Sequence, residues 1–232
     1  MNYVMSDLHG CADTFLEMLK KINFSNNDTL YILGDVVDRG EKSGELLLNI
    51  MKQMKNVHCI MGNHEQMLLQ ALPNAFEFLN KYGHHATLDL ECWHACGGDK
   101  TCASFSSLDE DTILEIYNYI LSFPFYKVVN VNDKKFLLIH AGLGCYNENK
   151  PLENYYPDEL VWYRFDHEGK YYPSEFDKII VGHTPTFLLT YHRPPRVFKG
   201  VNNVIDIDCG VVFEGGCLAC LCLDTMEEFY VE

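Results

Sequence analysis

Carboxylate, amide and imidazole side chains recur in this sequence at one kind of place, directly after short apolar segments. Asp7 and His9 follow Tyr3–Met5, and Asp35 follows Leu30–Leu33. Such oxygen and nitrogen donors suit Mn²⁺, Fe or Zn²⁺, and a set without thiolates disfavours a closed structural zinc site. The candidate metal ligands are Asp7, His9, Asp35, Asn63, His140 and His183. Six ligands are too many for one ion with an open position, so we expect two divalent ions, Mn²⁺ before Fe or Zn²⁺.

The elements that must position these side chains alternate between strand and helix in the first third of the chain. Asp35 lies 28 residues after Asp7, and Asn63 lies 28 residues after Asp35, about the length of one βαβ unit. Helical periodicity between the apolar segments, as at Phe15 and Leu19, completes the pattern. Parallel strands end at one edge of a sheet, so we expect these side chains to meet at that edge.

The rest of the chain predicts a helical insertion followed by a second group of strands. Residues 74–122 are mostly helical in pattern, and we interpret them as a cap over the sheet, with Ile113, Ile116, Ile120 and Leu121 at core spacing. The strands expected after it are Tyr126–Val131, Phe136–Ile139, Ile179–Val181, Phe187–Thr190, Val204–Ile207, Cys217–Leu223 and Glu228–Val231. We therefore expect one α/β domain, residues 1–232, with two packed mixed β-sheets flanked by helices.

The composition excludes several classes of protein. The 232 residues carry a net charge of −15, and 13% of them are aromatic, which excludes a disordered chain. The acidic balance argues against nucleic acid and anionic membrane as partners, because both attract clustered Lys and Arg. The sequence has no long apolar run, and its ten cysteines do not form a secreted disulfide pattern. We therefore expect a cytoplasmic protein, and its oligomeric state is left open.

Five motifs, in a fixed order, resemble those of the PPP-family serine/threonine protein phosphatases, within the calcineurin-like metallophosphoesterase superfamily. The motifs are Ser6–Gly10 (SDLHG), Gly34–Gly40 (GDVVDRG), Gly62–Glu65 (GNHE), His140–Gly142 (HAG) and Val181–Thr184 (VGHT). The stretch from Trp93 to Thr101, with Gly97-Gly98, and the segment Trp162-Tyr163-Arg164 are similar to the compact bacterial and phage branch. Ser6 departs from the commonest form of the first motif, which has Gly there.

The resemblance implies a role for each matched metal ligand. Asp7 and His9 would bind one ion, and Asp35 would bridge both ions. The second ion's shell would be completed by Asn63, His140 and His183. A water held between the two ions would then attack phosphorus in line.

The resemblance also implies which residues act on the substrate. His64 would protonate the departing oxygen as a general acid, and Asp38 would orient the His64 ring. Arg39 and Arg164 would bind the phosphoryl oxygens, because the guanidinium fork matches phosphate geometry, and Asn63 would also face the substrate.

The implied activity is hydrolysis of phosphoserine and phosphothreonine in proteins, with phosphotyrosine left open as a further substrate. The alternative is a diadenosine tetraphosphate hydrolase, a group with a similar fold and metal site. That group typically has Ala where Asp38 stands and Asp where Glu65 stands, so the motifs favour phosphoproteins as the partners. A non-catalytic module built on a decayed phosphatase is a further alternative, and the complete ligand set argues against it.

The cysteines offer a second metal hypothesis, which we do not favour. Cys92, Cys96 and Cys102 are close in sequence, but their spacing is not a recognised zinc-binding pair, so we expect them to pack. Cys217 and Cys220 lie in an apolar segment and are expected to be small buried thiols. None of the cysteines belongs to the predicted site.

Overall fold

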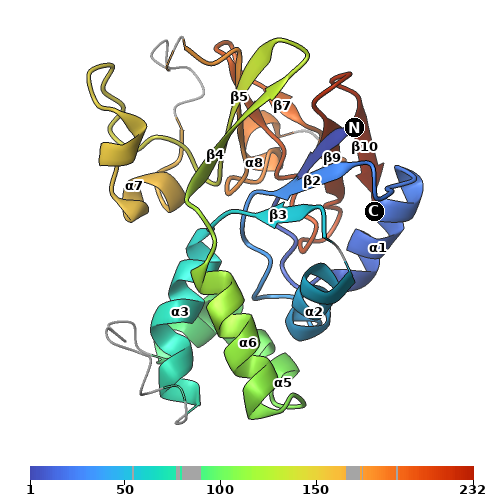
Figure 1. Cartoon of the computed structure of the whole chain (residues 1–232), viewed down its shortest axis with the longest axis vertical. Coiled ribbons are helices and arrows are strands. Elements are labelled where there is room, and N and C mark those ends of the chain that lie inside the picture. The colour runs from blue at the N-terminus through green and yellow to red at the C-terminus, as the bar shows by residue number, and fades with distance from the viewer. Residues whose placement is uncertain (54, 77–78, 80–89, 166–172, 174, 192) are drawn as a thin grey trace.

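Two five-stranded sheets form the centre of the computed structural model, which describes the whole chain except residues 54, 77–78, 80–89, 166–172, 174 and 192 (Figure 1). The first sheet has the order β10-β9-β1-β2-β3. Its strands are β1 (Asn2–Met5), β2 (Thr29–Ile32), β3 (Val57–Cys59), β9 (Leu218–Cys222) and β10 (Glu228–Val231). Strands β1, β2 and β3 are parallel, whereas β9 runs antiparallel to both β1 and β10.

The second sheet has the order β4-β5-β6-β8-β7. Its strands are β4 (Tyr126–Val131), β5 (Lys134–Ile139), β6 (Lys178–Val181), β7 (Phe198–Lys199) and β8 (Val204–Asp206). Strands β5, β6 and β8 are parallel, and the edge strands β4 and β7 are antiparallel to their neighbours. The expectation of two mixed sheets is therefore confirmed.

The two sheets pack through alternate residues of their strands. Val4 and Leu221 of the first sheet share one buried cluster with Leu138 and Ile180 of the second. The neighbouring Met5 belongs instead to the larger cluster that includes the buried residues of the helices. Successive side chains of a strand point to opposite faces of the sheet. Neighbouring residues of these strands therefore belong to different buried clusters, so both faces of the strands are apolar and buried.

Two helices cover the outer face of the first sheet. Helix α1 (Ala12–Lys21) contacts β9, β10 and helix α2 (Ser43–Gln53). Phe15 and Leu19 of α1 are buried, as the helical periodicity predicts. Each helix follows a strand and returns the chain to the next parallel strand, which places the strand ends β1, β2 and β3 at one edge.

The predicted insertion is helical where the structure describes it. Helix α3 (Asn63–Ala75) leads into it, and its elements are α4 (Leu90–Trp93), η2 (His94–Gly98), α5 (Asp99–Phe105) and α6 (Glu110–Leu121). Residues 77–78 and 80–89 of the expected cap lie outside the described residues. Helix α5 contacts α2, and α6 contacts α2 and α3, so these helices extend from the β3 side of the first sheet (Figure 1).

Two details of the pattern were wrong. Leu121, expected in the core with the buried Ile113, Ile116 and Ile120, is 58% exposed, because it lies at the end of α6. The segment Phe187–Thr190 is not a strand but the short helix α8, in which the backbone N–H of Thr190 donates to the carbonyl of Thr186 at 3.1 Å. A run of four residues is too short for its periodicity to distinguish a strand from one helical turn.

The remaining helical elements are η3 (Leu152–Asn154) and α7 (Pro157–Val161), both between β5 and β6. None of the helices in the described part of the chain is both long and apolar enough to cross a membrane.

Candidate metal centre

The predicted ligands lie together beyond the carboxyl ends of strands from both sheets. Asp7 follows β1, Asp35 follows β2, and Asn63 begins α3 directly beyond β3. His140 follows β5 and His183 follows β6, so the second sheet supplies the remaining imidazoles. Both sheets thus deliver side chains from the carboxyl ends of parallel strands, as expected.

The loops that carry these side chains hold an unusual backbone conformation. Six non-glycine residues of the site have φ between 43° and 70°, in the left-handed region. These residues are Asp7, His9, Asp35, Asp38, Arg39 and His183. Each such residue costs about 1–3 kcal/mol, so the rest of the fold must stabilise these loops.

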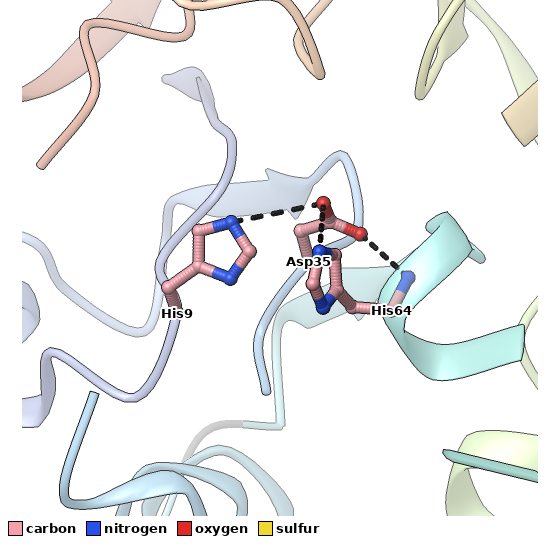
Figure 2. A group of neighbouring side chains, drawn as sticks. All are labelled: His9, Asp35 and His64. Carbon is pink, nitrogen blue, oxygen red and sulfur yellow. Dashed lines mark hydrogen bonds and ion pairs between the residues drawn. The ribbon is translucent and has the colours of Figure 1, made fainter. Parts of the chain in front are cut away.

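The first group of potential ligands consists of His9, Asp35 and His64 (Figure 2). The Nε2 atom of His9 lies 3.7 Å from Oδ2 of Asp35, and Nε2 of His64 lies 3.9 Å from the same oxygen. The backbone N–H of His64 donates to the other oxygen, Oδ1, at 3.0 Å. All three side chains are buried, which keeps their donor atoms away from bulk water.

The second group consists of Asp35, His140 and His183. The Nε2 atom of His140 lies 3.4 Å from Oδ1 of Asp35. The carbonyl oxygen Oδ1 of Asn63 lies 2.9 Å from Nε2 of His140 and 2.9 Å from Nδ1 of His183. Asp35 therefore presents one oxygen to each group, which is the arrangement expected of a carboxylate shared by two ions.

Backbone carbonyls fix which ring nitrogens face the centre. The Nδ1–H of His9 donates to the Val37 carbonyl at 2.9 Å, and that of His140 donates to the Leu33 carbonyl at 2.6 Å. Each ring thus presents the lone pair of Nε2 to the centre. At His140 this lone pair faces the Asn63 carbonyl oxygen, another acceptor, and a cation resolves such a convergence of acceptors. The residues present therefore fit divalent metal ions.

Burial keeps the imidazoles in the form that binds metals. It is the largest cause that lowers the pKa of His9 and His64 well below the usual value, lowers that of His140, and lowers that of His183 to about 2. Burial, followed by the charges of Asp7 and Glu65, raises the pKa of Asp35 well above its usual value. Neutral imidazoles are competent ligands, and a nearby cation would favour the ionised carboxylate.

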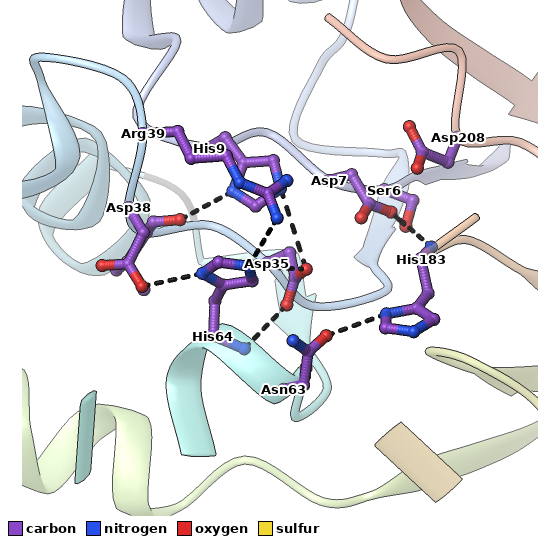
Figure 3. A network of polar contacts seen from close by, with 12 residues as sticks. Ser6, Asp7, His9, Asp35, Asp38, Arg39, Asn63, His64, His183 and Asp208 are labelled. Carbon is purple, nitrogen blue, oxygen red and sulfur yellow. Dashed lines mark hydrogen bonds and ion pairs between the residues drawn. The ribbon is translucent and has the colours of Figure 1, made fainter. Parts of the chain in front are cut away.

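Asp7 lies beside the second group and outside the two three-residue groups. Its Oδ2 accepts the backbone N–H of His183 at 3.0 Å and the hydroxyl of Ser6 (Figure 3). Gly182 is needed here, because a Cβ on it would lie 1.9 Å from the Ser6 hydroxyl oxygen and 2.3 Å from Asp7 Oδ2. The serine that departs from the common motif is therefore a hydrogen-bond partner of the predicted ligand.

His64 and Asp38 form the buried pair that the motifs predict. The Nδ1–H of His64 donates to Asp38 Oδ2 at 2.8 Å, and burial raises the pKa of Asp38 to about 7. Two residues of the insertion complete the shell of this carboxylate: Trp93 Nε1–H donates to Oδ2 at 2.9 Å and the Thr101 hydroxyl donates to Oδ1 at 2.7 Å. The motifs implied no role for Trp93 and Thr101, although the stretch that contains them was part of the resemblance.

Glu65 is a third residue whose role the sequence did not reveal. Its carboxylate accepts the backbone N–H groups of Asp35 and Val36, each at 2.7 Å, of Gly62 at 3.0 Å and of Val37 at 3.3 Å. It thereby fixes the loop that presents Asp35. Burial raises the pKa of Glu65 to about 7, against the effect of these four hydrogen bonds.

The two predicted arginines act on different candidate ligands. Arg39 donates from Nη1 to His9 Nε2 at 2.6 Å and from Nη2 to His64 Nε2 at 2.9 Å (Figure 3). Arg164 is exposed, and its charge contributes to the lowered pKa of His183, which places it on that side. Both guanidinium groups are therefore within electrostatic reach of the ligands.

Asp208 is a further buried acid near the candidate ligands. Its side chain lies near Asp7 and Ser6 in Figure 3, and its Oδ1 accepts the backbone N–H of Gly210 at 2.8 Å. Burial, and then the charge of Asp7, raises its pKa well above the usual value.

The cysteines lie apart from the described metal-type groups. Cys217 and Cys220 are buried, as expected, whereas Cys92 and Cys96 are exposed. Packing was therefore the wrong prediction for Cys92 and Cys96, because the short helix α4 and the turn after it face solvent at these positions. The metal-type groups found among the described residues contain no cysteine.

Comparison with known proteins supports the same chemistry. The calcineurin-like phosphoesterase family model matches residues 3–222. A symmetrical bis(5'-nucleosyl)-tetraphosphatase of Haemophilus ducreyi is 32% identical over 143 residues, which are 61% of this chain and 45% of that protein. The chain thus matches less than half the length of this curated relative.

Two solved structures share the fold at low sequence identity. One, assigned provisionally as a diadenosine tetraphosphatase, has a TM-score of 0.66 and 18% identity, with 99% of this chain and 92% of that chain covered. The other, a protein serine/threonine phosphatase from Saccharomyces cerevisiae, has a TM-score of 0.59 and 18% identity, with 100% and 80% covered. The family match over nearly the whole chain, and the ligands gathered at the sheet edges, lead to one assignment. The chain belongs to the calcineurin-like phosphoesterase family, whose members use divalent metal ions.

Proposed function

We propose that this chain hydrolyses the phosphoric anhydride chain of dinucleoside polyphosphates. The observation that carries metal-dependent hydrolysis is Asp35, which offers one carboxylate oxygen to each of two ligand groups. The substrate class is supported by the Haemophilus ducreyi relative, whose name specifies a bis(5'-nucleosyl) tetraphosphate. The motifs at Asp38 and Glu65 favoured phosphoproteins as substrates, with diadenosine tetraphosphate as the alternative, and the present proposal reverses that order.

The six predicted ligands would hold the ions, and Mn²⁺ suits their oxygen and imidazole donors. The resemblance assigns His9 and Asp7 to the first site and Asn63, His140 and His183 to the second, with Asp35 common to both, whereas Asp7 Oδ2 here accepts the backbone N–H of His183 beside the second group. Bound ions would neutralise phosphate oxygens and lower the pKa of the attacking water.

The arginines would bind the phosphate oxygens. Arg39 now donates to the ring nitrogens of His9 and His64 at 2.6 and 2.9 Å, and phosphate oxygens are stronger acceptors for the same two N–H groups. Arg164, on the His183 side, would contact the substrate from the opposite direction. The two residues would thus align the phosphate chain between them.

His64 would supply the proton for the leaving oxygen. Burial and then the charge of Arg39 hold the pKa of His64 well below its usual value. A phosphate dianion paired with Arg39 would offset that second cause and favour the protonated ring. Asp38, at 2.8 Å from Nδ1, would keep Nε2 directed toward the reacting bond.

A second candidate function is hydrolysis of phosphoserine and phosphothreonine esters in proteins, and the buried His64–Asp38 pair favours it. An alkoxide is a far more basic leaving group than a nucleotide phosphate, so it needs a proton more. Trp93 and Thr101 both donate to the Asp38 carboxylate that accepts from His64. The surrounding structure thus holds the His64–Asp38 pair in place.

The experiment is a direct comparison of kcat/KM in the presence of Mn²⁺ for diadenosine tetraphosphate and for phosphoserine and phosphothreonine peptides. We expect diadenosine tetraphosphate to be hydrolysed at least about tenfold more efficiently, with ADP as the sole product. Efficient hydrolysis of the peptides alone would establish the second candidate instead. Failure to hydrolyse any of them, by protein that has bound its metal, would contradict both.

A further inference from the structure

A pocket of about 610 Å³ lies next to the metal centre. It is formed by the segments that follow two site residues: α8, which begins four residues after His183, and the loop after Asp208. Its walls include Phe187, Phe213 and Arg193. A volume of this size is within the range of small-molecule sites.

Two aromatic rings form the apolar wall of the pocket. Phe187 and Phe213 pack edge to face, with ring centroids 5.7 Å apart, and Phe213 is 41% exposed. The guanidinium carbon of Arg193 lies 4.6 Å from the centroid of Phe187. Gly210 has φ of +67°, and a Cβ there would lie 2.7 Å from the Phe187 ring, so the absence of a side chain lets the rings meet. The pocket is thus a preformed aromatic surface with a cationic edge.

One side chain connects this pocket to the metal centre. The guanidinium carbon of Arg39 lies 5.8 Å from the centroid of Phe213. The terminal nitrogens of the same guanidinium contact His9 and His64 at 2.6 and 2.9 Å. A ligand whose phosphate binds Arg39 therefore has the exposed ring of Phe213 beside it.

We propose that this pocket binds a purine base of the substrate, stacked on Phe213. The inference rests on the proposed function and deepens it, because a dinucleoside polyphosphate carries an aromatic base on each side of its phosphate chain. Aromatic side chains and arginine guanidinium planes are the surfaces on which bases stack. The chemistry on each side of Arg39 thus matches one nucleotide: anion binding toward the ligands and π-stacking toward Phe213.

The test measures the contribution of the base without requiring turnover of a dinucleotide. Inhibition constants of ADP and of pyrophosphate are determined against p-nitrophenyl phosphate hydrolysis in Mn²⁺. The variants are Phe213→Ala and Phe213→Leu; the latter retains apolar volume but removes the aromatic face. The matched control is Tyr191→Ala, because Tyr191 is an 88% exposed aromatic residue just after α8 that does not line the pocket.

We expect ADP to inhibit the wild-type protein about tenfold more strongly than pyrophosphate, and both Phe213 variants to lose most of that difference. Pyrophosphate inhibition is the internal reference for Arg39 in each variant, so the ratio of the two inhibition constants isolates the contribution of the base, and this ratio should stay at the wild-type value in Tyr191→Ala. Equal inhibition by ADP and pyrophosphate in the wild type, or a preference that survives Phe213→Ala, would overturn the proposal.

The proposed function is tested separately by diadenosine tetraphosphate turnover. If that turnover is absent but the preference for ADP depends on Phe213, the base site stands and the substrate proposal fails. If turnover is efficient but independent of Phe213, the substrate proposal stands and the base site fails. A gain in affinity for phosphopeptides with an aromatic neighbour, without any preference for ADP, would also overturn the base site.

Discussion

At the scale of single residues, the geometry of the His64–Asp38 pair is compatible with two different roles. His64 faces the centre with Nε2 and donates from Nδ1 to a carboxylate, a geometry that suits either a general acid or a metal ligand. We propose that it serves in proton transfer, as the resemblance implies, because its Nδ1–H is directed to the Asp38 carboxylate and six other side chains are candidate ligands. The assignment has a direct consequence for substitution.

Replacement of His64 by Asn should lower kcat by about 10²–10⁴-fold, the usual contribution of a general acid, while metal content stays at the wild-type level. Steady-state kinetics and elemental analysis of the same sample provide the measurement. Loss of metal together with activity would show that His64 is a ligand.

Asp38→Asn tests the electrostatics of the same pair. Asn can accept from Trp93 and His64 through its carbonyl and donate to the Thr101 hydroxyl, so the fold should be retained. The pKa of Asp38 is raised to about 7 in the folded protein, so its carboxyl stabilises the fold at acidic pH, and this stability is lost as pH rises toward 7.

Both proteins are compared without metal. The free energy of unfolding of Asp38→Asn minus that of the wild type should therefore increase between about pH 4 and pH 8, by at most about 4 kcal/mol. Urea unfolding of both proteins across this range is the measurement. A difference that is independent of pH would show that Asp38 keeps an ordinary pKa.

At the scale of elements, the helical insertion acts as a support for the second motif loop. Trp93 is fully buried at the end of α4, and its indole donates to Asp38; the backbone N–H of Arg39 donates to the Gly97 carbonyl at 3.0 Å. Gly98 must lack a side chain because a Cβ would lie 2.3 Å from the Trp93 ring. The described part of the insertion thus contacts residues of the site, and the metal-type groups found among the described residues contain none of its side chains.

Trp93→Phe keeps an aromatic ring but removes one donor from Asp38. We expect kcat to fall about tenfold, with unchanged metal content and a shifted pH–rate profile, because Asp38 would hold His64 less firmly. Tyr117→Phe is the control, since it removes a donor to the Leu69 carbonyl at 3.1 Å elsewhere in the same insertion. If both variants lose activity equally, the effect of Trp93 is one of stability alone.

At the scale of the whole molecule, the sequence predicted those features that follow from the order and direction of the strands. Side chains placed after β1, β2 and β3 must share an edge if these strands are parallel and adjacent, and Asp7, Asp35 and Asn63 do so. The apolar segments are buried on both faces, so they form continuous apolar runs that could be recognised as strands in the sequence. The grouping of these candidate ligands could thus be predicted from order and spacing.

Contacts between distant segments could not be predicted in this way. The bonds from Trp93 and Thr101 to Asp38 span 55 and 63 residues, and no local pattern encodes them. The hydrogen bond from the backbone N–H of Asp35 to Glu65 spans 30 residues of sequence, and it depends on how α3 meets the sheet. The base pocket likewise arises only where α8, misread as a strand, meets the loop at Phe213.

We propose that the acidic protein, with a net charge of −15, uses the carboxylates and imidazoles that it buries together to hold two divalent ions. The most direct measurement is the metal content per chain, by elemental analysis, before and after exhaustive chelation and after Mn²⁺ is restored, with activity recorded on each sample. We predict about two ions per chain in the active protein, loss of activity with the metal, and recovery on addition of Mn²⁺. Full activity in a sample from which all metal has been removed would contradict the account.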